Sequence, residues 1–488
     1  MTIITEEFDK FIKENAFQLH ETFGGGFHLL DEGGIRRTCR DLKDPFGGRF
    51  GFINHYAVKA NTDYDHDDTG NDGTLEIVAS EGFGFDCSSI PELNKAVKVL
   101  LKFPAHKTNY NPDRKNNARI MFTSNNTSDD EFLHALHINN EIMPVIINVD
   151  DESVVRRLAK LNGGTLPETI CFRYNPGDRR SSGSTTANFG NPKGQKYGIA
   201  HEKFIDVYRT AIELGAKNFG IHTMIASNCL EIEYIQETIS MLLEIVVKAK
   251  EELGIEMQFI NMGGGIGIPY SPKAPRQERF NIEDLGSWVI ETFETFERVH
   301  GFCPDMNMEC GRYIAGPSGV LIGKVINKCY KHGVVVGLDI NTCSNPRPQK
   351  YGAEITGNEE EGWNINGYHH IEVISQNGET DETEVVSVVD SLCENDGRFA
   401  TDRELTKMEI GDIVVIYCTG AHALEMWSLY NSRFPCQHLM RYLNNSVKQI
   451  RREMRESDLD ATLTDLDNTV YVTDGDQNRC ISSVPVGT

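Results

Sequence analysis

The sequence has no apolar run of about 18 residues or more, the length that a membrane-spanning helix needs. Residues 1–17 carry acidic side chains where a signal peptide would have a basic end followed by an apolar stretch. We therefore expect a soluble protein of the cytoplasm.

The sequence also lacks any Cys-x-x-Cys pair, because its 12 cysteines are scattered from Cys39 to Cys480. Such scattering argues against a zinc site and against a disulfide framework. We expect no metal site, and we expect most of the thiols to be reduced and buried.

The sequence has few positive charges relative to negative ones. It contains 48 Lys and Arg and 72 Asp and Glu, which gives a formal net charge of -24. This balance would repel a phosphate backbone or an anionic membrane surface, which argues against both as partners.

Apolar residues make up 39% of the 488 residues, enough for a large core. The length allows about two to four domains, or one large barrel with a companion.

Between about residues 50 and 310, short apolar runs alternate with segments of helical period, which indicates βα units. Eight runs are expected to be strands: 52–60, 82–86, 118–123, 142–150, 169–175, 219–227, 257–264 and 305–309. The expected helices are 90–102, 128–138, 152–162, 201–215, 231–254 and 282–301. Eight parallel strands in a stretch of this length predict an α/β fold, a TIM (β/α)8 barrel.

After about residue 320 the pattern changes to β-branched runs without long helices, which predicts a separate β domain. These runs are 320–330, 333–340, 369–375, 384–393 and 411–421. Residues 24–31 also have the pattern of a strand and are expected to join this domain. The expected domains are an N-terminal segment, 1–45, contributing to the β domain, the barrel, 46–320, a C-terminal β-barrel or β-sandwich, 321–455, and a flexible tail, 456–488.

Three features at the ends of expected strands indicate an active site. Lys59 ends the first strand, where desolvation would lower its pKa and a neutral amine could form a Schiff base. Gly263 to Gly265 follow the seventh strand and could cradle a phosphate. Glu309 ends the eighth strand and could keep a pyridine nitrogen protonated, although an ion pair with Arg312 is the plain alternative. Together these features indicate a pyridoxal phosphate site.

Asp86 and Arg173 are two more charged residues at expected strand ends. They could contribute to the same site, or they could form an ion pair with each other.

Several motifs appear in order along the chain: YAVKAN, GFGFDCSSIPEL, FRYNPG with a later QKYGI, NMGGGIG, ECGRYIAG, SLCEND and GDIVVIYCTGAHA followed by YNSR. They resemble the ordered motifs of the fold-type III pyridoxal phosphate decarboxylases, the ornithine, diaminopimelate and arginine decarboxylase group. The segment NPRPQKYGAEI and the motif CEND are most similar to elements of the diaminopimelate decarboxylases. Ornithine decarboxylases would show a CDxxD pattern in place of CEND.

This resemblance implies pyridoxal 5'-phosphate as cofactor and a homodimer with shared active sites. The implied cofactor-binding residues are Lys59, Asp86, Arg173, Met224, Ser227, Gly263, Gly264, Gly265, Glu309 and His422. The implied substrate-binding residues are Arg312, Arg347, Tyr351 and Glu394. The implied catalytic residues are Lys59, which would bond to the cofactor, and Cys393, which would reach in from the second subunit and protonate the carbanion after carbon dioxide leaves.

The sequence departs from this family at three positions. Met224 stands where the family has a ring-stacking histidine, and we expect His222, two residues earlier, to point to the other side of its strand. His422 stands where the family has a phosphate-contacting tyrosine, and Cys310 stands where it usually has proline. Either the pocket has been rebuilt with its activity kept, or the substrate and reaction differ.

The activity that the resemblance implies is decarboxylation of meso-diaminopimelate to L-lysine and carbon dioxide. Decarboxylation of ornithine, lysine, arginine or a carboxylated polyamine is the alternative, which Met224 and His422 leave open. A racemase is a further possibility. An alternative outside the enzymes is a non-catalytic regulator with the same fold, although the presence of Lys59 and Cys393 argues against it.

Overall fold

The computed structural model describes residues 4–463, except 112, 182, 185–190, 271–278, 359–361 and 366. Contacts divide the chain into two units, residues 1–453 and 454–488. In the second unit the structure describes a short helix, α12 (Glu456–Asp460), and the part of the expected tail from residue 464 onward lies outside the described residues. None of the described helices combines the length and the apolar character that crossing a membrane requires.

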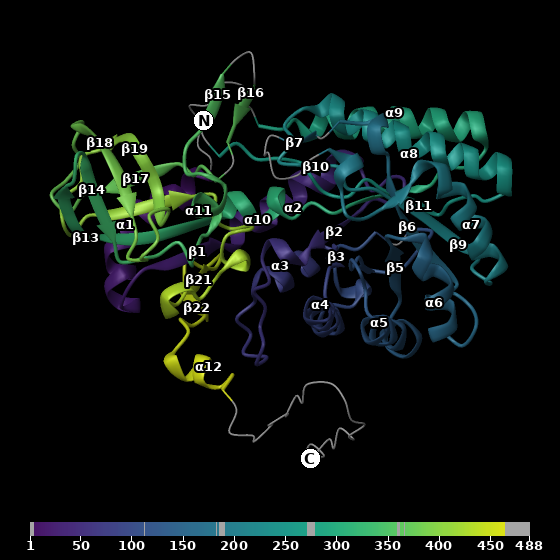
Figure 1. Cartoon of the computed structure of the whole chain (residues 1–488), viewed down its shortest axis with the longest axis horizontal. Helices are drawn as coiled ribbons and strands as arrows, with labels where there is room; N and C mark the ends of the chain where they lie inside the picture. Colours follow the sequence, from purple (N-terminus) through teal and green to yellow (C-terminus); the bar gives the residue numbers. More distant parts are fainter. Residues whose placement is uncertain are drawn as a thin grey trace, which may run out of the picture. The chain divides into compact units, whose positions relative to one another are not determined.

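The eight expected strands of the first unit form a closed parallel barrel (Figure 1). They are β2 (Ile53–Ala57), β3 (Gly84–Cys87), β4 (Ile120–Phe122), β5 (Val145–Val149), β6 (Thr169–Asn175), β9 (Asn218–His222), β11 (Phe259–Asn261) and β12 (Asp305–Met308). Their order is β5-β4-β3-β2-β12-β11-β9-β6, and pairing of β6 with β5 closes the ring. A short strand, β8 (Ile199–Ala200), pairs with the end of β6. The TIM barrel predicted from the sequence is confirmed.

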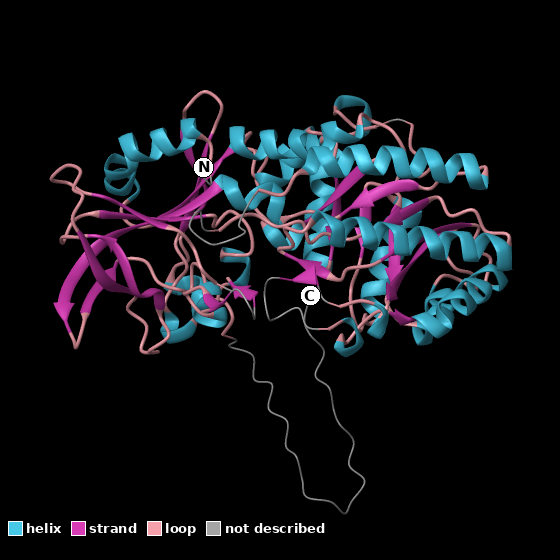
Figure 2. Cartoon of the chain, turned by 90° about the horizontal axis from the view of Figure 1, so that it is seen from above, coloured by secondary structure: helices cyan, strands magenta, loops and turns pink. Residues whose placement is uncertain are grey.

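Helices connect the barrel strands and cover the outside of the barrel, and all but the first of them were predicted from the sequence (Figure 2). They are α3 (Thr74–Ser80), α4 (Ile90–Lys102), α5 (Asp129–Glu141), α6 (Val155–Leu161), α7 (Phe204–Glu213), α8 (Ile232–Leu253) and α9 (Ile282–His300). Side chains cap several of them: Ser89 accepts a hydrogen bond from the backbone of Glu92 at the start of α4, and Ser128 forms a capping box with Glu131 at the start of α5. These local signals explain why the helix boundaries could be read from the sequence.

A nine-stranded sheet forms the second domain. Its strands are β1 (Phe27–Asp31), β13 (Gly319–Tyr330), β14 (Val334–Leu338), β17 (Ile371–Ile374), β18 (Thr383–Val389), β19 (Arg398–Thr406), β20 (Ile413–Tyr417), β21 (Gln437–Arg441) and β22 (Val447–Arg451). As expected, the N-terminal strand belongs here: β1 pairs antiparallel with β13 and parallel with β21. The sequence patterns did not reveal β19, β21 and β22.

Further helices and small strand pairs lie outside the barrel and the large sheet. The helices are α1 (Glu6–Phe23), α2 (Glu32–Lys43), α10 (Arg312–Ala315) and α11 (Arg347–Tyr351), and Lys59 lies in a 3-10 turn, η2 (Val58–Ala60). Two small pairs of strands are β7 (Gly183–Ser184) with β10 (Ala226–Ser227), and β15 (Thr356–Asn358) with β16 (Gly362–Asn364). Every cysteine in the described ranges is a free thiol, and all but Cys329 and Cys393 are buried.

The inside of the barrel is apolar at one level and polar at the next. Ala118, Met121, Ile146, Cys171 and Phe259 form a separate apolar cluster. Two residues further along three of these strands stand Asn148, Arg173 and Asn261, which are also buried. Since residues two apart on a strand share a face, polar groups gather toward the carboxyl ends of the strands, where barrels place their active sites.

The segment that follows Lys59 is bound to the sheet domain. The backbone N–H of His422 donates to the carbonyl of Ala60 at 2.8 Å, and the side chain of Asn61 donates to the carbonyl of Gly420 at 3.3 Å. The backbone N–H of Thr62 donates to Glu425 at 2.6 Å. The carboxyl ends of the barrel strands are therefore closed on this side by residues 420–425.

Candidate active site

A cavity of about 240 Å³ lies at the carboxyl ends of the barrel strands. Its lining residues are Ala57, Lys59, Met224, Ser227, Asn228, Gly264, Gly265, Ile266, Glu309, Gly311, Arg312, Arg347, Tyr351, His422 and Met426. The lysine, the glycine turn and the glutamate that the sequence singled out thus face one space, although they end three different strands. Parallel strands present their carboxyl ends at the same side, which explains this convergence.

Lys59 pairs with a buried carboxylate. Its Nζ lies 3.0 Å from Oδ2 of Asp86, while 48% of its side-chain surface remains accessible to solvent. Desolvation acts to lower the pKa of Lys59, but Asp86 and Glu309 outweigh it and raise the pKa above its ordinary value. The expected lowering is therefore wrong, because the sequence did not show how close the two carboxylates lie.

The suggested ion pair between Asp86 and Arg173 is also wrong. Asp86 pairs with Lys59, whereas the guanidinium of Arg173 lies 3.8 Å from the centre of the Tyr197 ring. Arg173 is buried and does not line the cavity. Burial and the nearby Glu309 raise the pKa of Asp86.

The glycine turn cannot accommodate side chains. Gly263 and Gly265 have φ of +72° and +105°, and a Cβ on Gly264 would lie 2.6 Å from the carbonyl oxygen of Glu309. Two N–H groups of the turn are engaged: Gly263 donates to Oδ1 of Asn261 at 2.8 Å, and Gly264 donates to Sδ of Met224 at 3.2 Å. Gly264 and Gly265 line the cavity, so the backbone of the turn passes close to it, as a phosphate-binding turn requires.

Two side chains inside the barrel hold Glu309. Oε1 accepts from Nδ2 of Asn261 at 2.8 Å, and Oε2 accepts from Nε2 of His222 at 3.2 Å. Burial alone would raise the pKa of Glu309, but the neighbouring His222 and Lys59 lower it to about 2. The carboxylate is not paired with Arg312 in the described ranges, so the plain salt bridge considered for these residues is wrong.

The expected orientation of His222 is wrong as well. Its side chain is buried inside the barrel and contacts Glu309 rather than pointing to the other side of β9. Residues two apart on a strand share a face, so the inward position of Met224 already implied an inward His222.

Arg312, Arg347 and Tyr351 form one end of the cavity, and Tyr270 contacts both arginines. Arg312 donates to the hydroxyl of Tyr270, and the guanidinium of Arg347 lies 5.4 Å from the ring centre of Tyr270 and 5.5 Å from that of Tyr351. Burial lowers the pKa of His422 well below its usual value, and Arg312 and Arg347 add to this effect. A neutral His422 and two cations therefore favour an anionic group at this end.

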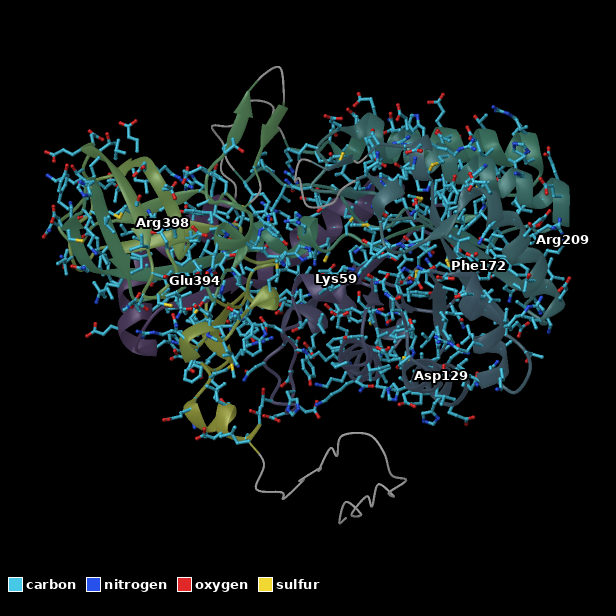
Figure 3. The ribbon with its side chains drawn as sticks, in the orientation of Figure 1. Lys59, Asp129, Phe172, Arg209, Glu394 and Arg398 are labelled. Carbon is cyan, nitrogen blue, oxygen red and sulfur yellow. The ribbon has the colours of Figure 1, made fainter. Side chains whose placement is uncertain are left out.

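Cys393 and Glu394 do not line this cavity. They line a separate hollow of about 590 Å³ in the sheet domain, and Figure 3 shows Glu394 in that domain, apart from Lys59. The exposed Cys393 has its Sγ 3.5 Å from the hydroxyl of Tyr430 and 3.3 Å from Nδ2 of Asn431. Hydrogen bonds with Tyr430 and Asn431 lower the pKa of this thiol.

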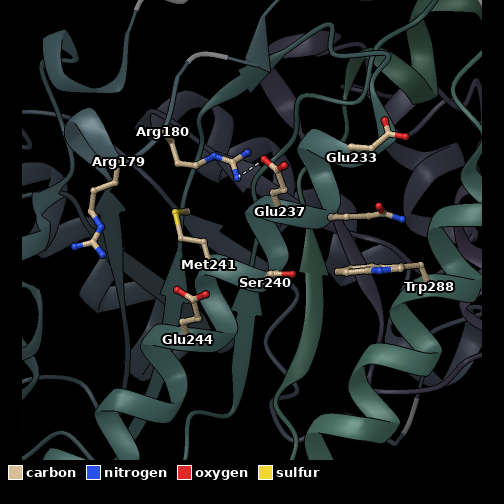
Figure 4. Close-up of a pocket in the computed structure, with 9 residues that line it drawn as sticks. Arg179, Arg180, Glu233, Glu237, Ser240, Met241, Glu244 and Trp288 are labelled. Atoms are coloured by element: carbon tan, nitrogen blue, oxygen red, sulfur yellow. Dashed lines mark ion pairs between the residues drawn. The ribbon is translucent and has the colours of Figure 1, made fainter.

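A third hollow, of about 560 Å³ and thus larger than the cavity that contains Lys59, lies on the outside of the barrel between α8 and α9 (Figure 4). Trp288 lines it, and an ion pair of 2.9 Å joins Arg180 to Glu237 there. None of the site residues expected from the sequence lines this hollow, so the smaller cavity is the candidate active site.

A barrel whose strand ends bring a lysine, a glycine turn and a buried carboxylate to one cavity defines a class of enzymes that bind an aldehyde cofactor carrying a phosphate. Residues 32–316 match the family model of the pyridoxal-dependent decarboxylase, pyridoxal binding domain, and residues 312–420 match the model of the C-terminal sheet domain. The chain belongs to the pyridoxal-dependent decarboxylase family and is a carboxy-lyase, as the resemblance in the sequence implied.

Similar proteins cover nearly the whole chain. Protein TabA of Pseudomonas amygdali pv. tabaci is 31% identical over 455 residues, 92% of this chain and 93% of that protein. Diaminopimelate decarboxylase of Methanothermobacter thermautotrophicus is 31% identical over 450 residues, 91% of this chain and 93% of that protein. The crystal structure of diaminopimelate decarboxylase from M. jannaschii in complex with L-lysine has a TM-score of 0.74 and 27% identity, and covers 91% of this chain and 93% of that chain.

The cavity fits pyridoxal phosphate, the cofactor of this family. A volume of about 240 Å³ is many times the roughly 10–15 Å³ that one water molecule needs, so it admits a six-membered ring with substituents. Oδ1 of Asp86 is buried without a hydrogen-bond partner in the described residues, so it can accept one from a ligand. The glycine turn and Glu309 supply the contacts that a phosphate and a pyridine nitrogen need.

Sequence reasoning missed the side chains that support this cavity. Asn261 and His222 hold Glu309, Tyr270 contacts both arginines, and Oδ1 of Asn228 accepts from the backbone of Ile268 at 2.9 Å. The alternation of β9 and β11 could have placed His222 and Asn261 inside the barrel. Nothing local indicated the contacts of Tyr270, because its partners come from distant segments.

Proposed function

We propose that the protein decarboxylates meso-diaminopimelate to L-lysine and carbon dioxide. The observation that carries this proposal is that Arg312 and Arg347 line the same cavity as Lys59. A guanidinium group binds a carboxylate well, so the arginine end suits a substrate with a second carboxylate beyond the one that leaves. Relatives named diaminopimelate decarboxylase support the same substrate.

Pyridoxal phosphate, when bound, supplies an electron sink for the electron pair left on Cα as carbon dioxide departs. Lys59 would hold the cofactor covalently through its Nζ. Its ammonium must first lose a proton, and Asp86, at 3.0 Å and with a raised pKa, is the adjacent acceptor. Glu309 would keep the pyridine nitrogen protonated, because its own low pKa leaves it ionised.

The remaining residues would bind the phosphate and ring of the cofactor and the distal carboxylate of the substrate. The backbone of Gly264 and Gly265, with Ser227 and His422, would donate to the phosphate, and Met224 would pack against the ring. Gly263 would contribute through the shape of the turn, because its N–H is bound to Asn261. Arg312, Arg347 and Tyr351 would orient the distal carboxylate. Arg173 would act only from outside the cavity, since it lies against Tyr197.

Cys393 and Glu394 would serve the site of a second copy of the chain. Within one chain they line a hollow other than the one that contains Lys59. The exposed thiol, with its lowered pKa, would then donate its proton to Cα of the product in the partner's cavity, and Glu394 would face the substrate amino group. This arrangement requires a homodimer with two shared sites.

Decarboxylation of another basic amino acid is the second candidate. Met224 and His422 line the cavity at positions where the family pattern has other residues, which favours a changed pocket. A panel of meso-diaminopimelate, ornithine, lysine and arginine, with released carbon dioxide as the readout, separates the two. We expect the highest kcat/KM with meso-diaminopimelate; a higher value with any monocarboxylate substrate would overturn the first proposal and support the second.

A further inference from the structure

Asn261 joins the two halves of the cofactor cradle. Its side chain lies at the end of β11 and is fully buried. Nδ2 donates to Oε1 of Glu309 at 2.8 Å, and Oδ1 accepts from the backbone N–H of Gly263 at 2.8 Å. The backbone N–H of Glu309 in turn donates to the carbonyl of Gly263 at 2.9 Å. One side chain thus touches both the carboxylate and the glycine turn.

The two contacts of Asn261 require a side chain with an amide group. The carboxylate of Glu309 accepts hydrogen bonds and the N–H of Gly263 donates one, so the group between them must donate on one side and accept on the other. An aspartate could still accept from Gly263 but would face Glu309 with a second negative oxygen. An alanine would leave both partners unsatisfied in a buried place, which is costly.

Glu309 is held from two directions. His222 donates to Oε2 while Asn261 donates to Oε1, so the carboxylate cannot rotate without breaking a hydrogen bond. Of the two anchors, only Asn261 also binds the glycine turn. His222 therefore orients the carboxylate, whereas Asn261 sets the position of the carboxylate relative to the turn.

We propose that Asn261 is a positioning residue that fixes Glu309 relative to Gly263, so that the contacts with the ring and with the phosphate of the cofactor form as one rigid unit. This inference rests on the proposed roles of Glu309 and the glycine turn. Asn261 does not itself line the cavity, and it acts through the two groups that it holds.

The test measures pyridoxal phosphate binding to the apoprotein by the absorption of the bound cofactor, together with the melting temperature. Asn261→Ala is expected to raise the dissociation constant about tenfold or more, since both hydrogen bonds to the cradle, with Glu309 and with Gly263, are lost. Asn148→Ala is the matched control, because Asn148 is a buried asparagine inside the barrel whose Nδ2 donates to Thr123 at 3.3 Å rather than to Glu309. The control should leave the dissociation constant within about twofold of the wild type even where it lowers the melting temperature.

A second pair of variants distinguishes the loss of this specific contact from a general loss of folding. Asn261→Asp should weaken binding and lower the melting temperature, because two carboxylates then face each other. Combining it with Glu309→Gln exchanges the amide and the acid and restores a donor opposite an acceptor. The double variant should regain the melting temperature of the wild type to within a few degrees while remaining inactive, because the carboxylate has left the cavity.

The outcomes separate the inference from the function on which it rests. Equal cofactor affinity in Asn261→Ala and the wild type, an equal loss in the control, or no thermal recovery in the double variant would overturn the role of Asn261 alone. A wild-type protein that does not bind pyridoxal phosphate would overturn the proposed function, and the inference with it.

Discussion

Sδ of Met224 lies 3.2 Å from the backbone nitrogen of Gly264 and accepts its hydrogen bond. Gly264 belongs to the turn that we assign to the cofactor phosphate. A phosphate oxygen that is to accept this N–H must first displace the sulfur. Met224 therefore competes with the anion for one donor of the cradle.

Met224→Leu keeps the volume of the side chain and removes the acceptor. Because the N–H of Gly264 is then free for the phosphate, we expect the dissociation constant for pyridoxal phosphate to fall about threefold, the worth of one weak hydrogen bond. Titration of the apoprotein measures this change. Unchanged or weaker binding would show that the sulfur does not compete.

Arg347→Met tests the carboxylate end of the cavity. We expect kcat/KM for meso-diaminopimelate to fall about 100-fold, as loss of a charged hydrogen-bond donor implies. Arg209→Met is the control, since Arg209 is an exposed residue of α7 that pairs with Asp206 (Figure 3). If the two variants keep the same kcat/KM, Arg347 does not bind the substrate.

Mixing two inactive variants tests the shared site. Lys59→Ala lacks the lysine that binds the cofactor, and Cys393→Ala lacks the proposed proton donor. In mixed dimers, one of the two sites has both residues, so an equal mixture should regain about a quarter of wild-type turnover. No recovery after subunit exchange, verified by a tagged partner, would place Cys393 outside the partner's site.

Stability should fall on acidification because buried histidines must stay neutral. Burial lowers the pKa of His369 to about 3, and its Nδ1 donates to the carbonyl of Tyr417 at 2.7 Å. Between pH 6.5, the ordinary value, and about 3 the unfolded state binds the extra proton, so the stability present above pH 6.5 is lost as the pH falls.

Urea unfolding between pH 4 and 7 measures this effect. His369→Asn keeps a donor but cannot titrate, so the free energy of unfolding should depend less on pH, by up to about 1.4 kcal/mol per pH unit. His137→Asn, an exposed position on α5, should leave the slope unchanged. An equal slope in His369→Asn and the wild type would contradict a neutral His369.

Much of the fold could be predicted because its signals are local. The runs that became β4 and β5 are mostly apolar and end in polar residues, and α4 begins at a serine cap and ends within the predicted range. Strands such as β19 (RFATDRELT) were missed because exposed polar residues interrupt their pattern. The convergence of Lys59, Gly264 and Glu309 followed from the topology of a barrel.

The electrostatics of the site could not be predicted in the same way. The partner of Lys59 is 27 positions away in the chain, and the partners of Glu309 lie 48 and 87 positions away. A pKa depends on such distances, which is why the shift of Lys59 was assigned the wrong sign. The inward position of His222 was available from strand alternation and was misjudged.

The central claim is that Nζ of Lys59 carries the cofactor. Borohydride reduction of the protein incubated with pyridoxal phosphate, followed by protease digestion and mass spectrometry, tests it most directly. The account predicts one phosphopyridoxyl group on the peptide that contains Lys59 and on no other lysine at one equivalent of cofactor. A peptide of Lys59 that remains unmodified, or a label on another lysine, would contradict it.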